Sequence, residues 1–294
     1  MVKSNALINI DLHDLPKVAI NLIDKCSDAI GGIAKPAQIR RVARAEADAA
    51  KIKTLSNIEN DKLIKRAQDR LLLEEANKQK NIEEIIKKAT PQLQQNAQPQ
   101  NMDNDWITHF FEKGKLISDD EMQLLWSRVL AGEANSPGTY SKRTVNFLET
   151  INRNEAALFQ TLCCYSWSLG ENNVPLMYDH NAEIYKKNGI TFGTLKHFEE
   201  IGLLSFSDFA FNGFVLQNFP KNIVCSYFEE MINIEFPNEK DNHLEVGHVK
   251  LSQIGQELAP ICDIKPIPGF FDYVLNRWKN PIEFIVTPSN YLTA

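Results

Sequence analysis

Few residues of this 294-residue chain have the types and spacing that catalysis requires. Asp179 and His180 form an adjacent acid and imidazole pair, but neighbours in sequence need not face each other, and no Ser or Cys nucleophile can be assigned to them. Glu239 and Lys240 follow a strand-like segment and suggest a nuclease, yet the metal-binding Asp expected on a paired strand is not identifiable. We therefore expect a surface role for Asp179 and His180 and discount the nuclease interpretation of Glu239 and Lys240, so a cryptic nuclease is the least supported hypothesis.

The standard catalytic motifs are absent from the sequence. It contains no phosphate-binding loop, dinucleotide fingerprint, zinc-protease helix, nucleophile elbow or deaminase signature. The cysteines form no CxxC pair and show no metal-ligand spacing with the histidines, and the adjacent pair is typical of small buried side chains in a reducing cytosol. These cysteines are Cys26, Cys163, Cys164, Cys225 and Cys262. We expect no catalytic residue, no cofactor and no metal site.

Charge is distributed unevenly along the chain, although the net charge is only −6. Residues 33–90 carry 14 basic and 9 acidic side chains, whereas residues 91–294 carry 15 basic and 25 acidic ones. A basic arm therefore precedes an acidic body. Such an arm could meet phosphates or an anionic membrane, but pairing with the body of a neighbouring copy is the favoured interpretation.

Two sets of cations are candidates for nucleic-acid contact. Arg40, Arg41 and Arg44 lie on the arm, where residues 40 and 44 share one face of a helix, but no aromatic side chains for base stacking lie between them. Lys196 lies on a helix that also carries Glu199 and Glu200. Both sets are weak candidates, because contacts to phosphate alone give non-specific binding and the body of the chain is acidic.

The first two segments are expected to be helical. Residues 1–33 contain an amphipathic helix with acidic and basic side chains mixed on its polar face, which favours packing on a partner helix over membrane contact by residues 14–30. Residues 34–90 contain no Gly or Pro from Ala37 to Ala89 and predict a long helical arm. Its apolar spacing is wider than the ~3.5 residues of a heptad coiled coil, so it suits a curved or right-handed assembly.

This arm is interpreted as an oligomerisation element, with a solvated helix rich in charge pairs as the alternative. The apolar positions assigned to assembly are Leu15, Leu22, Ile39, Ala43, Ala47, Ala50 and Ile58. The start of the chain lacks the apolar core and small-residue cleavage site of a signal peptide, and no stretch approaches the ~18 apolar residues of a spanning helix. A cytoplasmic homo-oligomer is expected.

The remaining segments predict a mainly α protein. Residues 91–104 are rich in Gln, Asn and Pro and predict a polar linker, and residues 105–170 predict a helical bundle of about four helices. A capping box is expected at Ser118 and Glu121, a cap at Ser141, and another at Asn152 or Asn154. The last helix of the bundle is expected to end at Gly170.

A winged-helix-like α+β domain is expected over residues 171–265, followed by a C-terminal helix and tail over residues 266–294. The pattern is a helix ending at Ile201-Gly202, short strands, and a Ser-x-x-Gly-x-x-Leu helix start at Ser252. Winged helices often bind DNA, but the acidic residues of this helix favour protein recognition or domain packing.

The string SDDEMQLLWSRVLAGE, followed by SPGTYSKRT, resembles an uncharacterised bacterial family known as a domain of unknown function. That family is in turn similar to the abortive infection alpha type of anti-phage proteins. The resemblance covers roughly residues 105–170 and supplies no active site to transfer. Its motif positions are Trp106, Phe110, Trp126, Gly132, Glu133, Pro137, Ser141, Arg143 and Thr144. Packing, turns and caps explain most of these positions, whereas Glu133 and Arg143 could form an ion pair or a recognition surface.

The resemblance implies a defence or stress protein instead of a metabolic enzyme. Our first hypothesis is a non-enzymatic abortive-infection protein that assembles through its N-terminal helices and binds a phage or host component. The alternative is a nucleic-acid-binding regulator that uses the winged helix and the basic arm.

Overall fold

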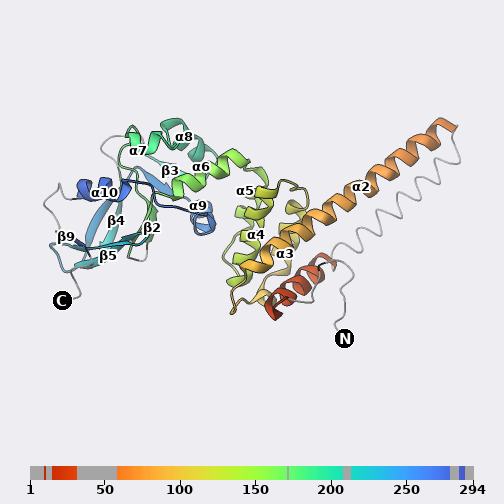
Figure 1. Cartoon of the computed structure of the whole chain (residues 1–294), viewed down its shortest axis with the longest axis horizontal. Coiled ribbons are helices and arrows are strands. Elements are labelled where there is room, and N and C mark those ends of the chain that lie inside the picture. The colour runs from red at the N-terminus through yellow and green to blue at the C-terminus, as the bar shows by residue number, and fades with distance from the viewer. Residues whose placement is uncertain are drawn as a thin grey trace. The chain divides into compact units, whose positions relative to one another are not determined.

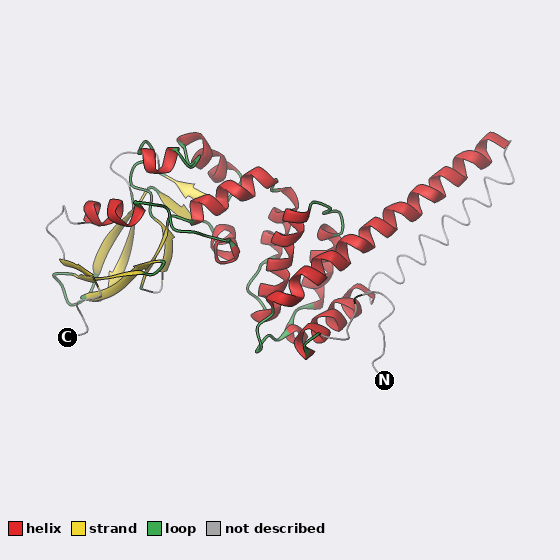
Figure 2. Cartoon of the chain, in the orientation of Figure 1, coloured by secondary structure: helices red, strands yellow, loops and turns green. Residues whose placement is uncertain are grey.

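The computed structural model describes residues 10, 15–31, 58–170, 172–207, 213–278 and 285–288. The chain divides into two compact units, Met1–Thr150 and Ile151–Ala294, and each unit has its own arrangement of helices and strands (Figures 1 and 2). Two sets of candidate residues lie outside the described ranges. They are the arginines proposed for nucleic-acid contact, Arg40, Arg41 and Arg44, and the assembly positions Ile39, Ala43, Ala47 and Ala50. Within the described ranges, no helix has the length and apolar content needed to cross a bilayer.

The prediction of a mainly α protein is wrong, because the fold is α+β. Unit 1 is helical, but unit 2 contains a five-stranded sheet and two two-stranded sheets, all of them antiparallel (Figure 2). The short alternating segments of the C-terminal half pair with one another, some in hairpins and others over long sequence distances, and this pairing makes them strands.

Unit 1 is an assembly of helices around an aromatic and aliphatic core. The first described helix covers residues 17–31. It is followed by α2 (Ile58–Ala89), the short 3-10 helices η1 (Thr90–Gln92) and η2 (Pro99–Asn101), α3 (Asn104–Gly114), α4 (Asp120–Asn135) and α5 (Lys142–Thr150). The largest fully buried side chains of this core are Leu22, Ile85, Ile86, Ile107, Phe110, Trp126 and Leu130. Leu22, expected to contact another copy, is thus completely buried in its own chain.

The segment expected to be a free linker is packed instead. Ala97, Pro99 and Met102 are buried, and the backbone N–H of Gln98 donates to the carbonyl of Ala134 at 2.7 Å. Composition predicted disorder because the segment is polar, but its two 3-10 turns place its few apolar side chains against the end of α4.

The helices α4 and α5 begin at capping residues close to the predicted ones, with the cap of α4 shifted by one residue. Asp119, not Ser118, caps α4 and accepts hydrogen bonds from the backbone N–H groups of Glu121 and Met122 at 3.1 and 2.9 Å. The negative charge of an aspartate at this position also interacts favourably with the positive end of the helix dipole. Ser141 caps α5 as expected, since its Oγ accepts from the Thr144 N–H at 3.2 Å.

Unit 2 combines short helices with the sheets. Its helices are α6 (Arg153–Cys163), α7 (Glu183–Lys186), α8 (Phe192–Glu200), α9 (Gln253–Leu258), the 3-10 helix η3 (Ala259–Ile261) and α10 (Phe270–Trp278). Its strands are β1 (Ser166–Leu169), β2 (Asn172–Pro175), β3 (Leu204–Phe206), β4 (Phe214–Phe219), β5 (Asn222–Tyr227), β6 (Glu230–Glu235), β7 (Asn242–Gly247), β8 (Val249–Leu251) and β9 (Ile285–Pro288). The large sheet has the order β2-β1-β5-β6-β9.

The helix expected to run to Gly170 ends earlier. It stops at Cys163, and Ser166–Leu169 forms β1, in which buried Trp167 and Leu169 alternate with half-buried serines. Gly170 has a positive φ of 63° next to β1, so it favours a turn and does not cap a helix. The period of two in Ser-Trp-Ser-Leu is the signal for a strand.

The expected winged-helix order is interrupted by inserted strands. After α8, β3 pairs antiparallel with β8, with Leu204 opposite Leu251, and Ser252 then caps α9 by accepting from the Gly255 N–H at 3.1 Å. Four strands, β4 to β7, lie in the sequence between β3 and β8, where a wing would be. The hairpin of β5 and β6 joins the large sheet through β1. The winged-helix relationship stays a prediction.

The start of α6 gives unit 2 a pH-dependent contribution to stability. Asn152 and Glu155 form a capping box, and Glu155 Oε1 lies 2.7 Å from His197 Nε2. Burial disfavours the charge of Glu155, but the hydrogen bonds from Asn152 and His197 outweigh it and hold the pKa of Glu155 below its usual 4.5. A carboxyl group that is more acidic in the folded state stabilises it above that value, and the contribution is lost as the pH falls through the folded pKa.

We therefore expect acid to destabilise wild-type unit 2 more than the Glu155→Gln variant. The urea midpoint, measured from about pH 6 down to about pH 3, should fall more steeply for the wild type. Parallel curves would show that the Glu155 carboxylate contributes nothing to the acid sensitivity.

Candidate association surface and polar groove

The two halves of α2 have different environments. In the C-terminal half, Ile82, Ile85, Ile86 and Ala89 recur on one face and are buried in unit 1. The N-terminal half extends beyond α3, α4 and α5 (Figure 1), and nearly all its side chains are exposed. Helices in proteins gain most of their stability from packing, so a projecting half that is exposed among the described residues is a candidate site for a partner.

Three consecutive leucines on this projecting half form what we name the leucine cluster, Leu71, Leu72 and Leu73. Their exposed fractions are 42%, 70% and 66%. Leu63, nearer the start of the helix, is 57% exposed. Because successive residues are ~100° apart around a helix, the cluster covers about half of its circumference. Contiguous exposed apolar side chains of this kind mark contact sites for other proteins.

A polar groove of about 900 Å³ lies beside the cluster, between α2 and the α3–α4 connection. Its charges balance, with three lysines and three carboxylates among the lining residues. Lys80 and Asn77 line it and make no polar contact with any part of the chain that the structure describes. The complete lining is Glu74, Asn77, Lys78, Lys80, Asn81, Glu84, Lys115, Leu116, Ser118, Asp120 and Gln123. A balanced, amide-rich lining suits a polar polypeptide segment better than a phosphate.

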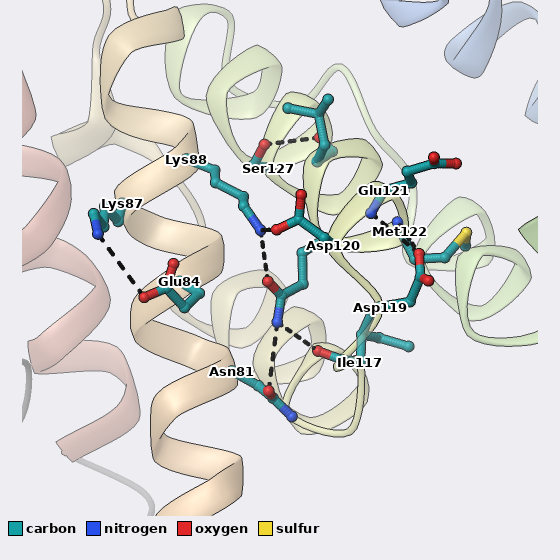
Figure 3. Close-up of polar contacts among 12 residues, drawn as sticks. Asn81, Glu84, Lys87, Lys88, Ile117, Asp119, Asp120, Glu121, Met122 and Ser127 are labelled. Carbon is teal, nitrogen blue, oxygen red and sulfur yellow. Dashed lines mark hydrogen bonds and ion pairs between the residues drawn. The ribbon is translucent and has the colours of Figure 1, made fainter.

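A hydrogen-bond network fixes the floor of the groove (Figure 3). Lys88 Nζ contacts Asp120 Oδ1 at 2.5 Å and donates to Gln123 Oε1 at 2.7 Å, which joins α2 to the start of α4. Gln123 Nε2 donates to the Ile117 carbonyl at 2.9 Å, and Asn81 Nδ2 donates to the Lys115 carbonyl at 2.9 Å. The groove is thus held by satisfied side chains, which gives it a fixed shape before any partner binds.

The aromatic motif positions form the core of unit 1. Phe110 lies between Trp106 and Trp126, with ring centroids 5.0 and 4.9 Å away, and Trp106 Nε1 donates to the Tyr140 carbonyl at 2.7 Å. At Gly132 an added Cβ would come within 2.7 Å of the Tyr140 hydroxyl, so a side chain there has no room. These residues pack the bundle and present no surface to a ligand.

Glu133 organises the turn between α4 and α5. Its buried carboxylate accepts from the backbone N–H groups of Gly138 at 2.6 Å and Tyr140 at 2.9 Å. Thr144 is buried beside the Ser141 cap, Pro137 is half-buried in the turn, and Arg143 is exposed. The structure therefore gives Glu133 a structural role in the turn.

We expect Glu133→Gln to destabilise unit 1 by about 2 kcal/mol, because an amide can present only one acceptor oxygen to the two N–H groups. The free energy of unfolding from urea denaturation would measure this. Glu149→Gln is the matched control, since Glu149 pairs with Lys113 at 2.7 Å on the surface and should change stability by less than about 1 kcal/mol. Equal effects of the two substitutions would contradict the assignment.

The chain matches one family model, that of a protein of unknown function (DUF2806), over residues 65–275. The chain belongs to the DUF2806 family. No curated protein and no solved structure matches it. The expectation of an uncharacterised family is confirmed, whereas the comparisons give no support for the similarity to abortive infection alpha proteins or for the motif. The DUF2806 match includes the leucine cluster, the groove and most of unit 2.

The pairs that suggested catalysis make separate contacts. Asp179 accepts from the Asn181 N–H at 2.8 Å, while the His180 ring contacts the Asn181 amide and lies 5.5 Å from the ring of Phe192. Glu239 pairs on the surface with Lys221 at 3.2 Å. Among the described residues, no group of three or more His, Cys, Asp or Glu side chains could hold a metal ion.

Lys196 is engaged inside unit 2. Its Nζ lies 3.1 Å from Glu199 Oε2 and 5.4 Å from the centre of the Phe206 ring. A cation held between a carboxylate and an aromatic face is already neutralised, so its attraction for a phosphate is weak.

Of the positions assigned to assembly, Leu15 is half-buried and Ile58 is the first residue of α2.

Neither the leucine cluster nor the groove was predicted from the sequence. The signal for the cluster was present, because three consecutive leucines within a highly charged helix cannot all face one core. The groove had no such signal, since α2 and the α3–α4 connection are separated by a stretch of polar sequence.

Proposed function

We propose that this chain is a non-catalytic cytoplasmic binding protein that self-associates through the projecting half of α2 and acts in anti-phage defence of the abortive-infection kind. The observation that supports self-association is the exposed leucine cluster on a helix that extends away from its own bundle. The defence role is supported by the sequence resemblance of the motif region. A phage or host component is the proposed trigger.

Charge favours a second copy as the partner of α2. Residues 62–80 carry six Lys or Arg and three Asp or Glu, whereas residues 151–294 carry ten basic and seventeen acidic side chains. A basic, apolar helix and an acidic unit in one chain attract each other between copies, and such complementarity sets partner choice and association rate. This contact would be head-to-tail, so it could extend beyond a dimer.

The function is tested by phage challenge of a bacterial host that expresses the chain. With the wild type we expect protection at low multiplicity and collapse of the culture at high multiplicity. The Leu72→Glu/Leu73→Glu variant should lose this protection, because two charges in the cluster prevent its burial at a contact. Leu124→Glu, at a 39%-exposed leucine of α4, should keep it.

Two outcomes would contradict the proposal. Full infection by every phage, with the wild type present as a folded protein, would remove the defence role. Equal protection by the wild type and the Leu72→Glu/Leu73→Glu variant would show that defence does not depend on the leucine cluster. A steeply salt-dependent shift of DNA by the purified protein would favour the nucleic-acid-binding alternative instead.

A further inference from the structure

The hairpin of β5 and β6 presents apolar side chains to solvent. Of the large apolar side chains that are exposed in the described part of unit 2, three lie on this hairpin, namely Val224, Phe228 and Met231, with exposed fractions of 49%, 38% and 49%. Val224 pairs with Asn233 across the hairpin, and Met231 pairs with Ser226. Since paired residues point to the same side of a sheet, Val224 and Met231 are diagonal neighbours on one exposed face.

The turn of the hairpin holds Phe228 in a conformation that a bulky residue rarely adopts. The pairing of β5 with β6 leaves Phe228 and Glu229 as a two-residue turn, and Phe228 has a φ of 54°. Glycine or asparagine adopts this φ with less strain. The Phe228 ring lies 4.8 Å from the ring of Tyr227, whose hydroxyl donates to the Cys164 carbonyl at 2.8 Å. The turn thus presents a large aromatic ring on a fixed base, in spite of the backbone strain.

The hairpin is acidic as well as apolar, and we name residues 222–235 the acidic hairpin. It carries three glutamates and no Lys or Arg. Glu235 pairs with Lys221 at 3.9 Å. Glu229 and Glu230, by contrast, are exposed and have no ion-pair partner in the part of the chain that the structure describes. The acidic hairpin therefore combines an apolar surface with two uncompensated negative charges, which attract a basic and apolar partner.

The projecting half of α2 has the complementary charge. Residues 62–73 carry four Lys or Arg and one Asp, and they include the leucine cluster. Lys62 and Arg66 are four residues apart and share one face of the helix. Leu73 lies two turns beyond Arg66 on the same face. Lys62 and Arg66 have no ion-pair partner among the described residues, so their charges are available to another molecule.

We propose that the acidic hairpin is the surface on which the projecting half of α2 of a second copy docks. This inference rests on the proposed self-association and names the partner surface for it. From Lys62 to Leu73 the helix spans ~17 Å, and a strand of six residues spans about 17–20 Å, so the two elements can lie along each other. In this contact the leucine cluster covers the exposed apolar side chains of the hairpin, while Lys62 and Arg66 approach its two unpaired glutamates.

The other exposed apolar side chains of unit 2 suit a basic helix less well. Phe192 is 44% exposed, but Lys196 Nζ lies 6.0 Å from the centre of its ring, so a cation already faces that surface. Val215 is 43% exposed and is the one large apolar side chain of β4 that is described as exposed. Among the described residues of unit 2, the acidic hairpin therefore offers the largest group of exposed apolar side chains together with unpaired carboxylates.

Exchange of charges between two copies of the full-length protein tests this contact. Glu229→Lys/Glu230→Lys and Lys62→Glu/Arg66→Glu should each weaken self-association at least about tenfold in sedimentation velocity, because like charges then meet at the contact. An equimolar mixture of the two variants should recover the assemblies, since the altered hairpin of one copy is basic and the altered helix of the other is acidic. Recovery in the mixture also shows that the contact forms between copies.

Two further variants separate the contact from effects of overall charge and of folding. Glu183→Lys/Glu200→Lys makes the same change of charge as Glu229→Lys/Glu230→Lys, on exposed residues of α7 and α8, and should associate as the wild type does. Phe228→Asn removes the exposed ring but keeps the turn, because asparagine adopts a positive φ readily. It should weaken self-association without unfolding unit 2.

The outcomes distinguish the docking site from self-association itself. A wild type that is monomeric at every concentration would overturn both. Association of Glu229→Lys/Glu230→Lys as strong as that of the wild type, with Leu72→Glu/Leu73→Glu monomeric, would overturn the docking site alone and place the partner surface of α2 elsewhere. A mixture of the two charge-exchanged variants that stays monomeric would also overturn the docking site.

Discussion

Replacement of Gly247 by alanine is expected to unfold unit 2, at a cost of about 4 kcal/mol or more. An added Cβ would lie 2.1 Å from the carbonyl oxygen and 2.4 Å from the carbonyl carbon of Met177, and both atoms belong to the backbone. The same carbonyl accepts a hydrogen bond from the His248 N–H at 2.6 Å, so it cannot move away without loss of that bond. Gly247 also has a φ of 90°, which alanine adopts with strain.

Gly202 provides the control for the backbone strain alone. It has a similar φ of 84°, but an added Cβ would meet nothing within 4 Å. Gly202→Ala should therefore cost only about 1–2 kcal/mol, the penalty for the positive φ. Urea unfolding followed by circular dichroism measures both variants. Similar losses for the two would show that the close approach to Met177 does not restrict residue 247.

Phe110→Ala is expected to destabilise unit 1 by about 3–5 kcal/mol. The ring is completely buried, and it contacts Trp106, Trp126 and Phe111 at centroid distances of 5.0, 4.9 and 5.1 Å. Its removal deletes three aromatic contacts and leaves a cavity between rigid rings that cannot collapse to fill it. The result would establish that this motif position acts through packing.

Leu124→Ala is the matched control for the aromatic core, since Leu124 lies on α4 but is 39% exposed. We expect a loss of about 1–2 kcal/mol, because part of the Leu124 side chain stays in water on folding and its truncation leaves no enclosed cavity. Loss of stability in Phe110→Ala no greater than in Leu124→Ala would contradict a packing role for Phe110. Tryptophan fluorescence follows the transition directly, because Trp106 and Trp126 flank the altered ring.

Local signals in the sequence predicted most of the helix boundaries. The caps at Ser141 and Asn152 are observed, because a cap depends on residues three positions apart. The β1 strand was missed because Ser166–Leu169 directly follows a helix with similar apolar content. Its strand character comes from pairing on both sides, with β2 in a hairpin and with Cys225 and Ser226 of β5, which are far away in sequence. Such pairing with neighbouring strands decides strands more than local propensity does.

The functional surfaces were harder to predict than the fold. A leucine in a helix is usually buried in the core of its own protein. Leu72 and Leu73 are exposed because the part of α2 that packs in the bundle begins only near Ile82. This exposure arises from tertiary structure, which a single sequence does not encode in any short spacing.

Self-association through α2 is tested by sedimentation velocity of the full-length protein over a range of protein and salt concentrations. We expect the wild type to form species larger than a monomer, and these should weaken as salt rises because the contact joins a basic helix to an acidic unit. The Leu72→Glu/Leu73→Glu variant should sediment as a folded monomer at every concentration, with its affinity for a second copy reduced at least about tenfold, and Leu124→Glu should behave as the wild type. A wild type that is monomeric throughout, or assemblies that persist in Leu72→Glu/Leu73→Glu, would contradict self-association through the leucine cluster.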